Sequence, residues 1–183
     1  MHFSSNNDSL SSSFDATGLQ HYLSFGNMTV STSAVISNQE ELMTIPDAEE
    51  VWIQRFPVTG LDRFVFPHLP SLRTLLLGNN SFSGVSSFEL NELDSLEEVI
   101  ILQKCFAEGS DTLRISNCTS LKSLRIGDES FANYHSLELF NLPSLQSIVI
   151  GKSCFLETPL SLTSLLYGDS WTNRPSFTTL YQT

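Results

Sequence analysis

Three cysteines and four histidines are the residues of this chain that could bind a metal ion or act as nucleophile and base. A zinc site usually needs ligands at close spacing such as Cys-x-x-Cys, and no cysteines here have that spacing. The histidines are scattered, so a catalytic triad or an acid–base pair is not expected to form. The sequence therefore predicts no enzyme, no metal site and no cofactor. The residues concerned are Cys105, Cys118, Cys154, His2, His21, His68 and His135.

The element that would have to position any site is a repeat. One sequence motif begins at Leu69 and recurs at Leu93, Cys118 and Leu142, so its copies start 24, 25 and 24 residues apart. A period of this length is the signature of a solenoid, in which each unit buries its apolar face against its neighbours. The spacing within each unit places two apolar residues on one face of a strand. The frame consists of Leu72, Leu75, Leu77; Leu96, Val99, Ile101; Leu121, Leu124, Ile126; and Leu145, Ile148, Ile150.

A second alternating apolar pair follows in every unit and predicts a second short strand per coil. Between the strands lie Ser, Asn, Gly and Asp, which favour turns, and no segment is long enough for an amphipathic helix. The predicted fold is all-β (α/β by some conventions), a solenoid with coils of about 24 residues and two short strands per coil. The second pairs are Phe88 and Leu90, Leu113 and Ile115, Leu137 and Leu139, and Leu160 and Leu162; Gly78, Gly127 and Gly151 stand in register after the first strand.

The frame Leu-x-x-Leu-x-Leu-x-x-Asn-x-Phe at Leu72 to Phe82 resembles a leucine-rich repeat. Units such as Asn117-Cys-Thr-Ser-Leu121 with a later Ser-Phe131 are similar to the BspA-like repeats of protists and some bacteria. The resemblance covers about residues 40 to 164. It implies that the predicted solenoid is of the leucine-rich-repeat-like type. The chain departs from the family pattern where an asparagine usually caps the coil: Asn80 has the register mates Lys104, Glu129 and Ser153.

The chain divides into four parts by composition and repeat register. A Ser- and Asn-rich tail is expected to be disordered, and an irregular N-terminal cap is expected to cover the first coil. The solenoid begins with a degenerate coil whose core positions are found by subtracting 24. The last part is an abbreviated C-terminal cap or a truncated coil. The parts are residues 1–13, 14–39, 40–164 and 165–183, and the degenerate coil has Ile45, Ala48, Val51, Ile53, Phe64 and Phe66 at its core positions.

The outward position between the two core residues of the first strand is apolar in four of five coils. Successive coils lie about 4.8 Å apart, so these residues form a row. Flanking segments or neighbouring side chains could cover the row, or it could be an exposed stripe that a partner protein covers. Tryptophan is favoured at interface hot spots, which supports the second interpretation. The proposed partner-binding residues are Trp52, Leu76, Ile100, Arg125 and Val149.

Two further rows alternate in charge from coil to coil. Cross-strand ion pairs of this kind contribute about 0.2 to 1 kcal/mol each, so we expect both rows to fix the stacking register. They are Glu49, Arg73, Glu97, Lys122, Gln146 and, on the second side, Val65, Glu89, Arg114, Glu138, Ser161.

Two of the cysteines, Cys105 and Cys154, occupy the same repeat position two coils apart. Their Cα atoms should lie about 10 Å from each other, beyond the limit of about 7 Å for a disulfide. Cys118 stands in a leucine column and is expected in the core. Three unpaired thiols favour a reducing compartment.

The charge balance of 9 basic and 20 acidic residues gives a formal charge of −11. An acidic surface repels the phosphate backbone, so nucleic acid is not an expected partner, nor is an anionic membrane face. No apolar run approaches the roughly 20 residues that span a bilayer, so no membrane insertion is expected, and no secretory signal is visible. These features and the thiols favour a cytoplasmic location. An extracellular one stays open if the chain is a fragment.

We therefore expect a non-catalytic protein–protein interaction module that uses the outer face of the solenoid. The alternative is a fragment of a surface or secreted adhesin-like repeat protein, which the BspA-like resemblance allows. Glycans would favour this alternative, and sequons are present at Asn27, Asn79 and Asn117. The sequence does not identify the partner.

Overall fold

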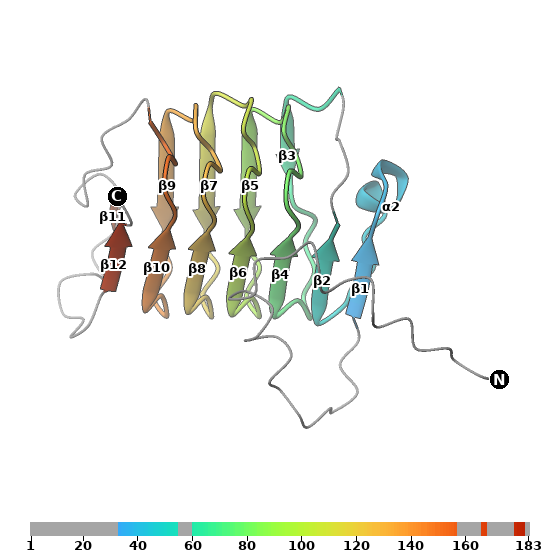
Figure 1. The fold of residues 1–183 in the computed structure, drawn as a ribbon. Coiled ribbons are helices and arrows are strands. Elements are labelled where there is room, and N and C mark those ends of the chain that lie inside the picture. Colours follow the sequence, from blue (N-terminus) through green and yellow to red (C-terminus); the bar gives the residue numbers. More distant parts are fainter. Residues whose placement is uncertain (1–32, 55–59, 157–165, 168–177, 182–183) are drawn as a thin grey trace, which may run out of the picture. The chain divides into compact units, whose positions relative to one another are not determined.

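The computed structural model describes residues 33–54, 60–156, 166–167 and 178–181. Over these residues the chain winds into a β-solenoid, and successive coils place their strands side by side in two parallel sheets (Figure 1). The prediction of an all-β solenoid with coils of about 24 residues and two strands per coil is confirmed. The hydrophobic core is built from residues of both sheets and of the turns between them.

The first sheet, which we call sheet A, contains the frame predicted from the repeat. Its strands pair in parallel, and partner residues in neighbouring central strands are 24 or 25 positions apart, as in the pairs Leu75–Val99 and Val99–Leu124. In spatial order the strands are β1 (Ser33–Ile36), β2 (Glu50–Ile53), β4 (Thr74–Leu77), β6 (Glu98–Ile101), β8 (Ser123–Ile126), β10 (Ser147–Ile150) and β12 (Thr178–Tyr181).

The second sheet, sheet B, contains the second strand of each coil and is also parallel. The predicted pairs Phe88–Leu90, Leu113–Ile115 and Leu137–Leu139 all lie in it and are buried. Leu160, Ser161 and Leu162 lie outside the described residues. The strands in spatial order are β3 (Arg63–Val65), β5 (Ser87–Asn91), β7 (Thr112–Ser116), β9 (Ser136–Phe140) and β11 (Leu166–Tyr167).

The core follows the predicted columns. Leu75, Val99, Leu124 and Ile148 each retain 0 or 1% of their surface, so one shared interior column runs through four coils. The degenerate first coil obeys the same frame, since its predicted core positions from Ile45 to Phe66 are all buried. Full burial of one such aliphatic side chain stabilises the folded state by about 1.5–3 kcal/mol, so each coil is held mainly by its apolar contacts with the next.

Phenylalanines from the turns between the two sheets form a second interior column. The rings of Phe82, Phe106, Phe131 and Phe155 are stacked, with successive centroids 5.1, 4.5 and 5.5 Å apart. All four have a positive φ of 52–59°, which is unusual for a bulky side chain. The left-handed backbone turns the ring into the core, and the stacking and burial of the rings offset the conformational cost.

Backbone hydrogen bonds between coils reinforce the register outside the strands. The residue preceding each of β4, β6, β8 and β10 donates its N–H to the carbonyl oxygen of the equivalent residue one coil earlier, at 2.7–2.9 Å. These bonds connect Arg73 to Glu49, Glu97 to Arg73, Lys122 to Glu97 and Gln146 to Lys122. Gly151 permits a similarly close approach at the other end of the strand, because a Cβ there would lie 2.4 Å from Asp128 Oδ1.

A short helix that the sequence did not predict lies between β1 and β2. It is α2 (Gln39–Met43), and Asn38 caps it by accepting a hydrogen bond from the Glu41 N–H at 2.9 Å. The Glu41 carboxylate accepts a bond from the N–H of Ser37, the residue before the cap, at 2.8 Å, which connects the start of the helix to the chain that leads into it. Leu42 is buried in the core cluster. The predicted boundary at residues 39 and 40 thus falls inside this helix, while the predicted tail 1–13 and residues 14–32 of the predicted cap lie outside the described residues.

Candidate partner-binding face

The five proposed partner-binding residues lie in one row on sheet A. The pairing register connects Trp52 to Leu76 and Leu76 to Ile100, and then continues to Arg125 and Val149. Val35 of β1 precedes the row. Because side chains alternate across a strand, these residues point away from the columns that fill the core. The structure therefore brings together residues that are 24 or 25 positions apart in the chain.

The row is not uniformly exposed. Leu76 and Ile100 retain only 9% and 5% of their surface, so the two central members are buried side chains. Trp52, Arg125 and Val149 are half-buried, and Val35 is 49% exposed. A continuous exposed stripe is therefore absent from the described residues of this row, and the accessible surface lies at its two ends.

Beside this row runs a string of ion pairs. Glu97 accepts bonds from both Arg73 and Lys122, with the closest N–O separation 2.5 Å in each pair. These bonds lower the pKa of the Glu97 carboxyl, Lys122 having the larger effect and Arg73 the smaller. The expectation that opposite charges pair from coil to coil is confirmed for these three residues. The string crosses three coils, so it opposes a slip in their register.

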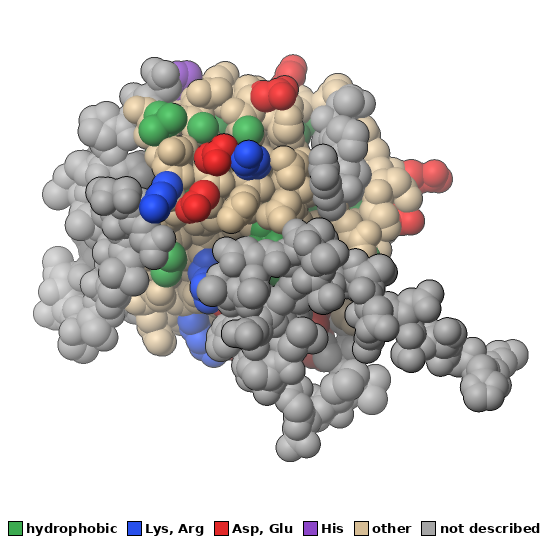
Figure 2. All heavy atoms as spheres, in the orientation of Figure 1, with side chains coloured by type: hydrophobic (Ala, Val, Ile, Leu, Met, Phe, Trp, Pro, Cys, Tyr) green, Lys and Arg blue, Asp and Glu red, His purple; other side chains and the backbone are tan. Residues whose placement is uncertain are grey.

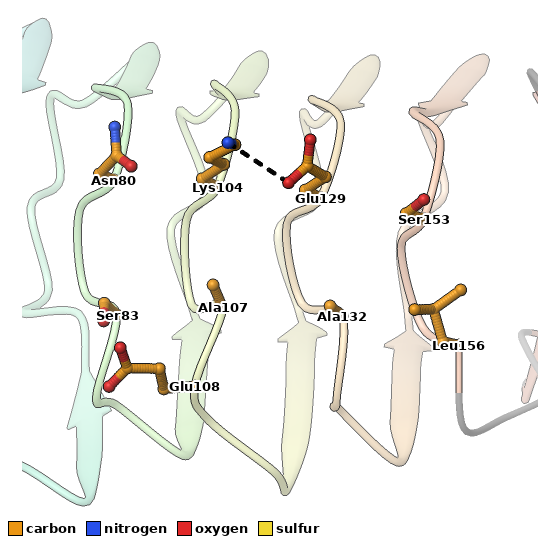
Figure 3. A pocket seen from close by; sticks show the side chains of 9 residues that line it. All are labelled: Asn80, Ser83, Lys104, Ala107, Glu108, Glu129, Ala132, Ser153 and Leu156. Carbon is orange, nitrogen blue, oxygen red and sulfur yellow. Dashed lines mark ion pairs between the residues drawn. The ribbon is translucent and has the colours of Figure 1, made fainter.

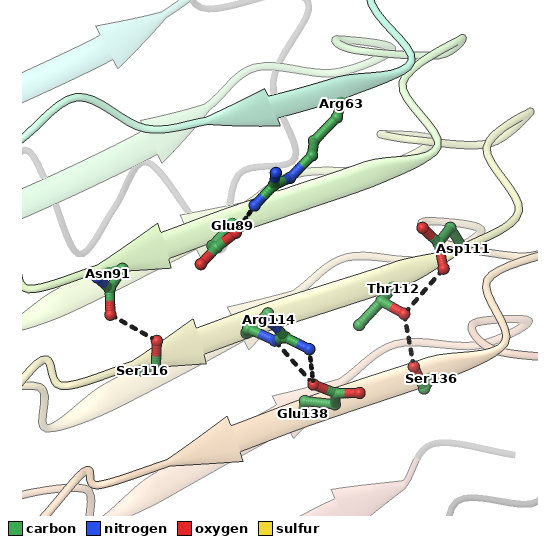
Figure 4. Close-up of polar contacts among 9 residues, drawn as sticks. All are labelled: Arg63, Glu89, Asn91, Asp111, Thr112, Arg114, Ser116, Ser136 and Glu138. Atoms are coloured by element: carbon green, nitrogen blue, oxygen red, sulfur yellow. Dashed lines mark hydrogen bonds and ion pairs between the residues drawn. The ribbon is translucent and has the colours of Figure 1, made fainter.

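The outer face of sheet B carries a similar arrangement (Figure 4). Arg114 bonds Glu138 of the next strand at 2.7 Å, as the row predicted. Arg63 reaches diagonally to Glu89 at 2.5 Å, a contact that the row did not predict because Val65 is the register partner of Glu89. On the face drawn in Figure 2, Lys and Arg side chains lie next to Asp and Glu side chains, and hydrophobic side chains form small separate spots.

The turns between the two sheets form a shallow groove of about 580 Å³ that crosses several coils. Figure 3 shows its two rows of side chains, with an ion pair between Lys104 and Glu129 on one rim, where the N–O separation is 3.4 Å. Ser83, Ala107 and Ala132 line the other row with Glu108 beside them, and Leu156 at its end is 68% exposed. The lining residues are Asn80, Ser83, Lys104, Ala107, Glu108, Glu129, Ala132, Ser153 and Leu156.

The three thiols are structural in this fold. All are free, and Cys118 is fully buried in the core as predicted. The Cys105 thiol donates to the Gly78 carbonyl oxygen and the Cys154 thiol to that of Gly127, each one coil earlier. Burial raises the pKa of Cys105 to about 12 and that of Cys118 and Cys154 to about 11. The thiols therefore stay protonated at neutral pH and are poor nucleophiles and poor metal ligands.

The histidines inside the described ranges are His68 and His135. The Nδ1 of His68 lies 2.9 Å from the Glu92 carbonyl oxygen, at a turn after sheet B. Over residues 33–54, 60–156, 166–167 and 178–181, no three His, Cys, Asp or Glu side chains are grouped to hold a metal ion. In the same ranges, no helix has the length and apolar character that would be required to cross a membrane.

An asparagine ladder is present, but not in the Asn80 column considered from the sequence. It follows sheet B, where Asn117 Nδ2 donates to Asn91 Oδ1 at 3.1 Å and Asn141 Nδ2 donates to Asn117 Oδ1 at 2.9 Å. Ser116 also donates to Asn91 (Figure 4). Two asparagines 24 residues apart, Asn117 and Asn141, were the signal in the sequence. In the first turn, the Asn79 side chain accepts a bond from the Gln103 N–H. In both sequons within the described residues, at Asn79 and Asn117, the asparagine side chain thus makes hydrogen bonds to a neighbouring coil.

No protein-family model, no curated protein and no solved structure matches the chain. Functional inference therefore depends on the fold and on the surfaces just described.

Proposed function

We propose that this chain is a non-catalytic protein-binding module and that the outer face of sheet A contacts the partner. One observation carries the proposal: the parallel register aligns Trp52, Leu76, Ile100, Arg125 and Val149 in one outward row, four of them apolar. Contiguous apolar patches on a protein surface often mark sites where a partner packs. A sheet held by in-register coils presents such a row in a fixed geometry, which lowers the entropic cost of binding.

The burial within the row assigns different roles to its members. Leu76 and Ile100, at 9% and 5% exposure, would form the floor of the contact and support their neighbours. Trp52 and Val149 are half-buried and would be covered directly by the partner. Tryptophan buries a large area on contact and is enriched among the residues that dominate binding energy, so Trp52 is the expected hot spot.

We also propose that the repeat is of the leucine-rich, BspA-like type. The support is the match between the repeat frame and the buried columns: Leu72, Leu75 and Leu77 and their register mates fill the core in every described coil. The phenylalanine at the end of each motif copy is also buried, in the column of stacked rings formed by Phe82, Phe106, Phe131 and Phe155. At the family's capping position, Asn80 is present, but its register mates are Lys104, Glu129 and Ser153.

The proposal is tested by cross-linking the protein to its partner in cell extract and identifying the product by mass spectrometry. Trp52→Ser and Val149→Ser remove apolar surface from the row without altering the core columns. Val65→Ser is the matched control, because Val65 is 46% exposed on the outer face of sheet B. The proposal expects both row variants to lose the cross-linked partner, and the control to retain it, while all three keep the wild-type circular dichroism spectrum.

Two results would contradict the proposal. One is that Trp52→Ser and Val149→Ser capture the same partner as the wild-type protein with equal yield. The other is that Val65→Ser loses the partner as fully as they do, which would place the contact elsewhere or make it non-specific. If Trp52→Ser fails to fold, the comparison of Val149→Ser with Val65→Ser decides the question.

A further inference from the structure

The groove in the turns between the two sheets has two rims, and each rim is one repeat position followed through four successive coils (Figure 3). Lys104, Glu129 and Leu156 are exposed, so both rims are open to a partner. We call the rims the charged rim and the alanine rim. The charged rim is Asn80, Lys104, Glu129 and Ser153, and the alanine rim is Ser83, Ala107, Ala132 and Leu156.

The charged rim is complementary to itself when its order is reversed. Its two central members have opposite charges, and its outer members, Asn80 and Ser153, are an amide and a hydroxyl that can form a hydrogen bond with each other. Consider a second copy of the chain, related by a twofold axis that crosses the groove between the coils of Lys104 and Glu129. This rotation places Lys104 of each copy opposite Glu129 of the other, and Asn80 opposite Ser153.

The alanine rim is complementary to itself under the same rotation, through the sizes of its side chains. Leu156 at one end is 68% exposed, and the residue at the other end, Ser83, is small. The rotation places the leucine side chain of each copy over the serine of the other, which removes apolar surface from water. Ala107 and Ala132 face each other at the centre, where their small side chains allow the two backbones to come close.

The repeat position next to the alanine rim adds a third matching pair. Its members in the two central coils are Glu108 and Asn133, both exposed. The Asn133 Nδ2 donates to the Ala107 carbonyl oxygen of its own chain at 3.1 Å, and the amide group has a second N–H. The rotation places Glu108 of each copy opposite Asn133 of the other, so the carboxylate can accept that N–H.

The ion pair within each chain leaves its two members able to bind a second partner. The N–O separation of Lys104 and Glu129 is 3.4 Å, and their side chains are 52% and 57% exposed. The ammonium group has three N–H donors and the carboxylate has two oxygens. Two copies would therefore join two cations and two anions in one network, and a network contributes more than an isolated surface pair.

We propose that two copies of this chain associate through the groove in a symmetric dimer, with their solenoid axes antiparallel. The contact spans four coils, about 14 Å along the axis. This is small for a permanent dimer, so we expect a weak one with a Kd of about 100 µM. The outward row of sheet A takes no part in the contact, and the inference is independent of the proposed function.

The dimer is tested by sedimentation velocity on the full chain, at concentrations from about 5 to about 500 µM. About 0.15 M salt is used, because it screens the repulsion between two chains of formal charge −11 beyond about 8 Å. The sedimentation coefficient should rise with concentration from the monomer value toward the dimer value. A monomer throughout this range would overturn the proposal.

Charge reversal on the charged rim identifies the contact. Lys104→Glu and Glu129→Lys should each weaken self-association at least about tenfold, because two attractive contacts of the symmetric dimer become repulsive. An equimolar mixture of the two variants should regain the association of the wild type. In the mixed dimer the two reversed charges face each other, and so do the two unchanged charges. Neither variant can form this ion pair within its own chain, so recovery requires contact between chains.

The matched control is charge reversal of the pair Arg114 and Glu138. This pair also connects neighbouring coils, and its side chains are 50% and 46% exposed, but it lies on the outer face of sheet B. Arg114→Glu and Glu138→Arg should each change self-association by less than about twofold. Leu156→Ser tests the alanine rim without altering charge, and it should weaken self-association about three- to tenfold.

The remaining outcomes also decide the question. If both charged-rim variants are folded by circular dichroism and associate like the wild type, or if their mixture does not regain association, the contact lies elsewhere and the proposal is wrong. Equal losses in the control variants would assign self-association to overall charge and overturn it too. If a charged-rim variant does not fold, Leu156→Ser is compared with Val65→Ser, which removes an apolar side chain that is 46% exposed on sheet B. Equal association of these two variants would contradict the proposal, and a loss in Leu156→Ser alone would support it.

Discussion

The hydroxyl of Tyr134 donates a hydrogen bond of 2.6 Å to the carbonyl oxygen of Val85, two coils earlier in the chain. Gly109 has the equivalent position in the coil between them, and a Cβ there would lie 2.1 Å from that oxygen and 2.5 Å from Tyr134 Cε2. Tyr134 is fully buried. Val85, Gly109 and Tyr134 occupy the same repeat position in three successive coils. The hydrogen bond therefore depends on how these three coils pack together.

Replacing Gly109 by alanine should destabilise the fold, because the added methyl group has no room between Val85 and Tyr134. Overpacking of this kind typically costs about 1–3 kcal/mol. Tyr134→Phe, which keeps the ring and removes the donor, should cost about 1–3 kcal/mol by leaving the Val85 oxygen without its bond. Urea denaturation measures both. A Gly109→Ala protein as stable as the wild type would show that the three coils are not packed in this way.

One position of the first turn has a small hydrogen-bond donor in four successive coils: Ser81, Cys105, Ser130 and Cys154. A substitution at Ser130 tests the role of this position. The Ser130 hydroxyl donates to the Leu102 carbonyl oxygen at 2.8 Å and accepts from the Cys105 N–H at 3.1 Å. Ser130→Ala should leave both groups unsatisfied and cost about 2–4 kcal/mol. Ser130→Cys should cost clearly less, since cysteine fills the same position at Cys105 and Cys154. Equal losses of unfolding free energy in the two variants would contradict this role.

The buried thiols predict a loss of stability at alkaline pH. Burial raises the pKa of Cys105 to about 12, and that of Cys118 and Cys154 to about 11, above the ordinary value of 9.0. The unfolded chain therefore releases these protons first, so the stabilisation is complete below pH 9.0 and is lost as the pH rises toward the folded-state values. Urea midpoints should fall across this range.

The control for the alkaline effect is Cys154→Ser, which keeps a small donor at the same position. It should fall less steeply with pH than the wild type, because one titrating group has been removed. Identical slopes for the two proteins would assign the alkaline loss to other groups, such as Tyr134, whose pKa burial also raises.

Acid should weaken the ion-pair string beside the proposed binding face. Bonds from Lys122 and then Arg73 lower the pKa of Glu97 below its ordinary value of 4.5. The stabilisation by Glu97 is therefore present above that pH and is lost as the pH falls through the lowered pKa. Glu97→Gln should reduce the acid dependence of the urea midpoint by a small amount, since the string is largely solvent-exposed. The neighbouring Glu98→Gln is the control, and an equal effect of the two would contradict the assignment.

The repeat period and the alternation of side chains were sufficient to predict the core. They correctly place Leu75, Val99, Leu124 and Ile148 in one column, because a parallel register and a two-residue side-chain period leave no freedom in which residues face inward. The same reasoning predicts that Trp52 and Leu76 face outward. It does not predict how much of their surface stays open, since exposure depends on what packs nearby and not on period.

Features set by local backbone geometry were not predicted. Helix α2 is only five residues long, and the Asn38 and Glu41 bonds at its start are too short a signal to predict a helix where the sequence indicates an irregular cap. The left-handed backbone at Phe106 and its register mates contradicts the usual preference of bulky residues, and the ring stacking that offsets its cost is visible only in three dimensions. The asparagine ladder lies in the turn after sheet B, whereas Asn80 and its register mates lie in the turn after sheet A. The capping position considered in the sequence therefore gives no information about the ladder.

The most direct test of the whole account is a methyl NOE experiment on the isotopically labelled protein. In-register stacking predicts strong cross-peaks between Leu75 and Val99 and between Val99 and Leu124 on the interior side, and between Leu76 and Ile100 on the exterior side. Observing these contacts would establish that residues one repeat apart are neighbours in space. Cross-peaks from Leu76 to Val99 or Leu124, with none to Ile100, would mean a different register and would remove both the core columns and the proposed binding face.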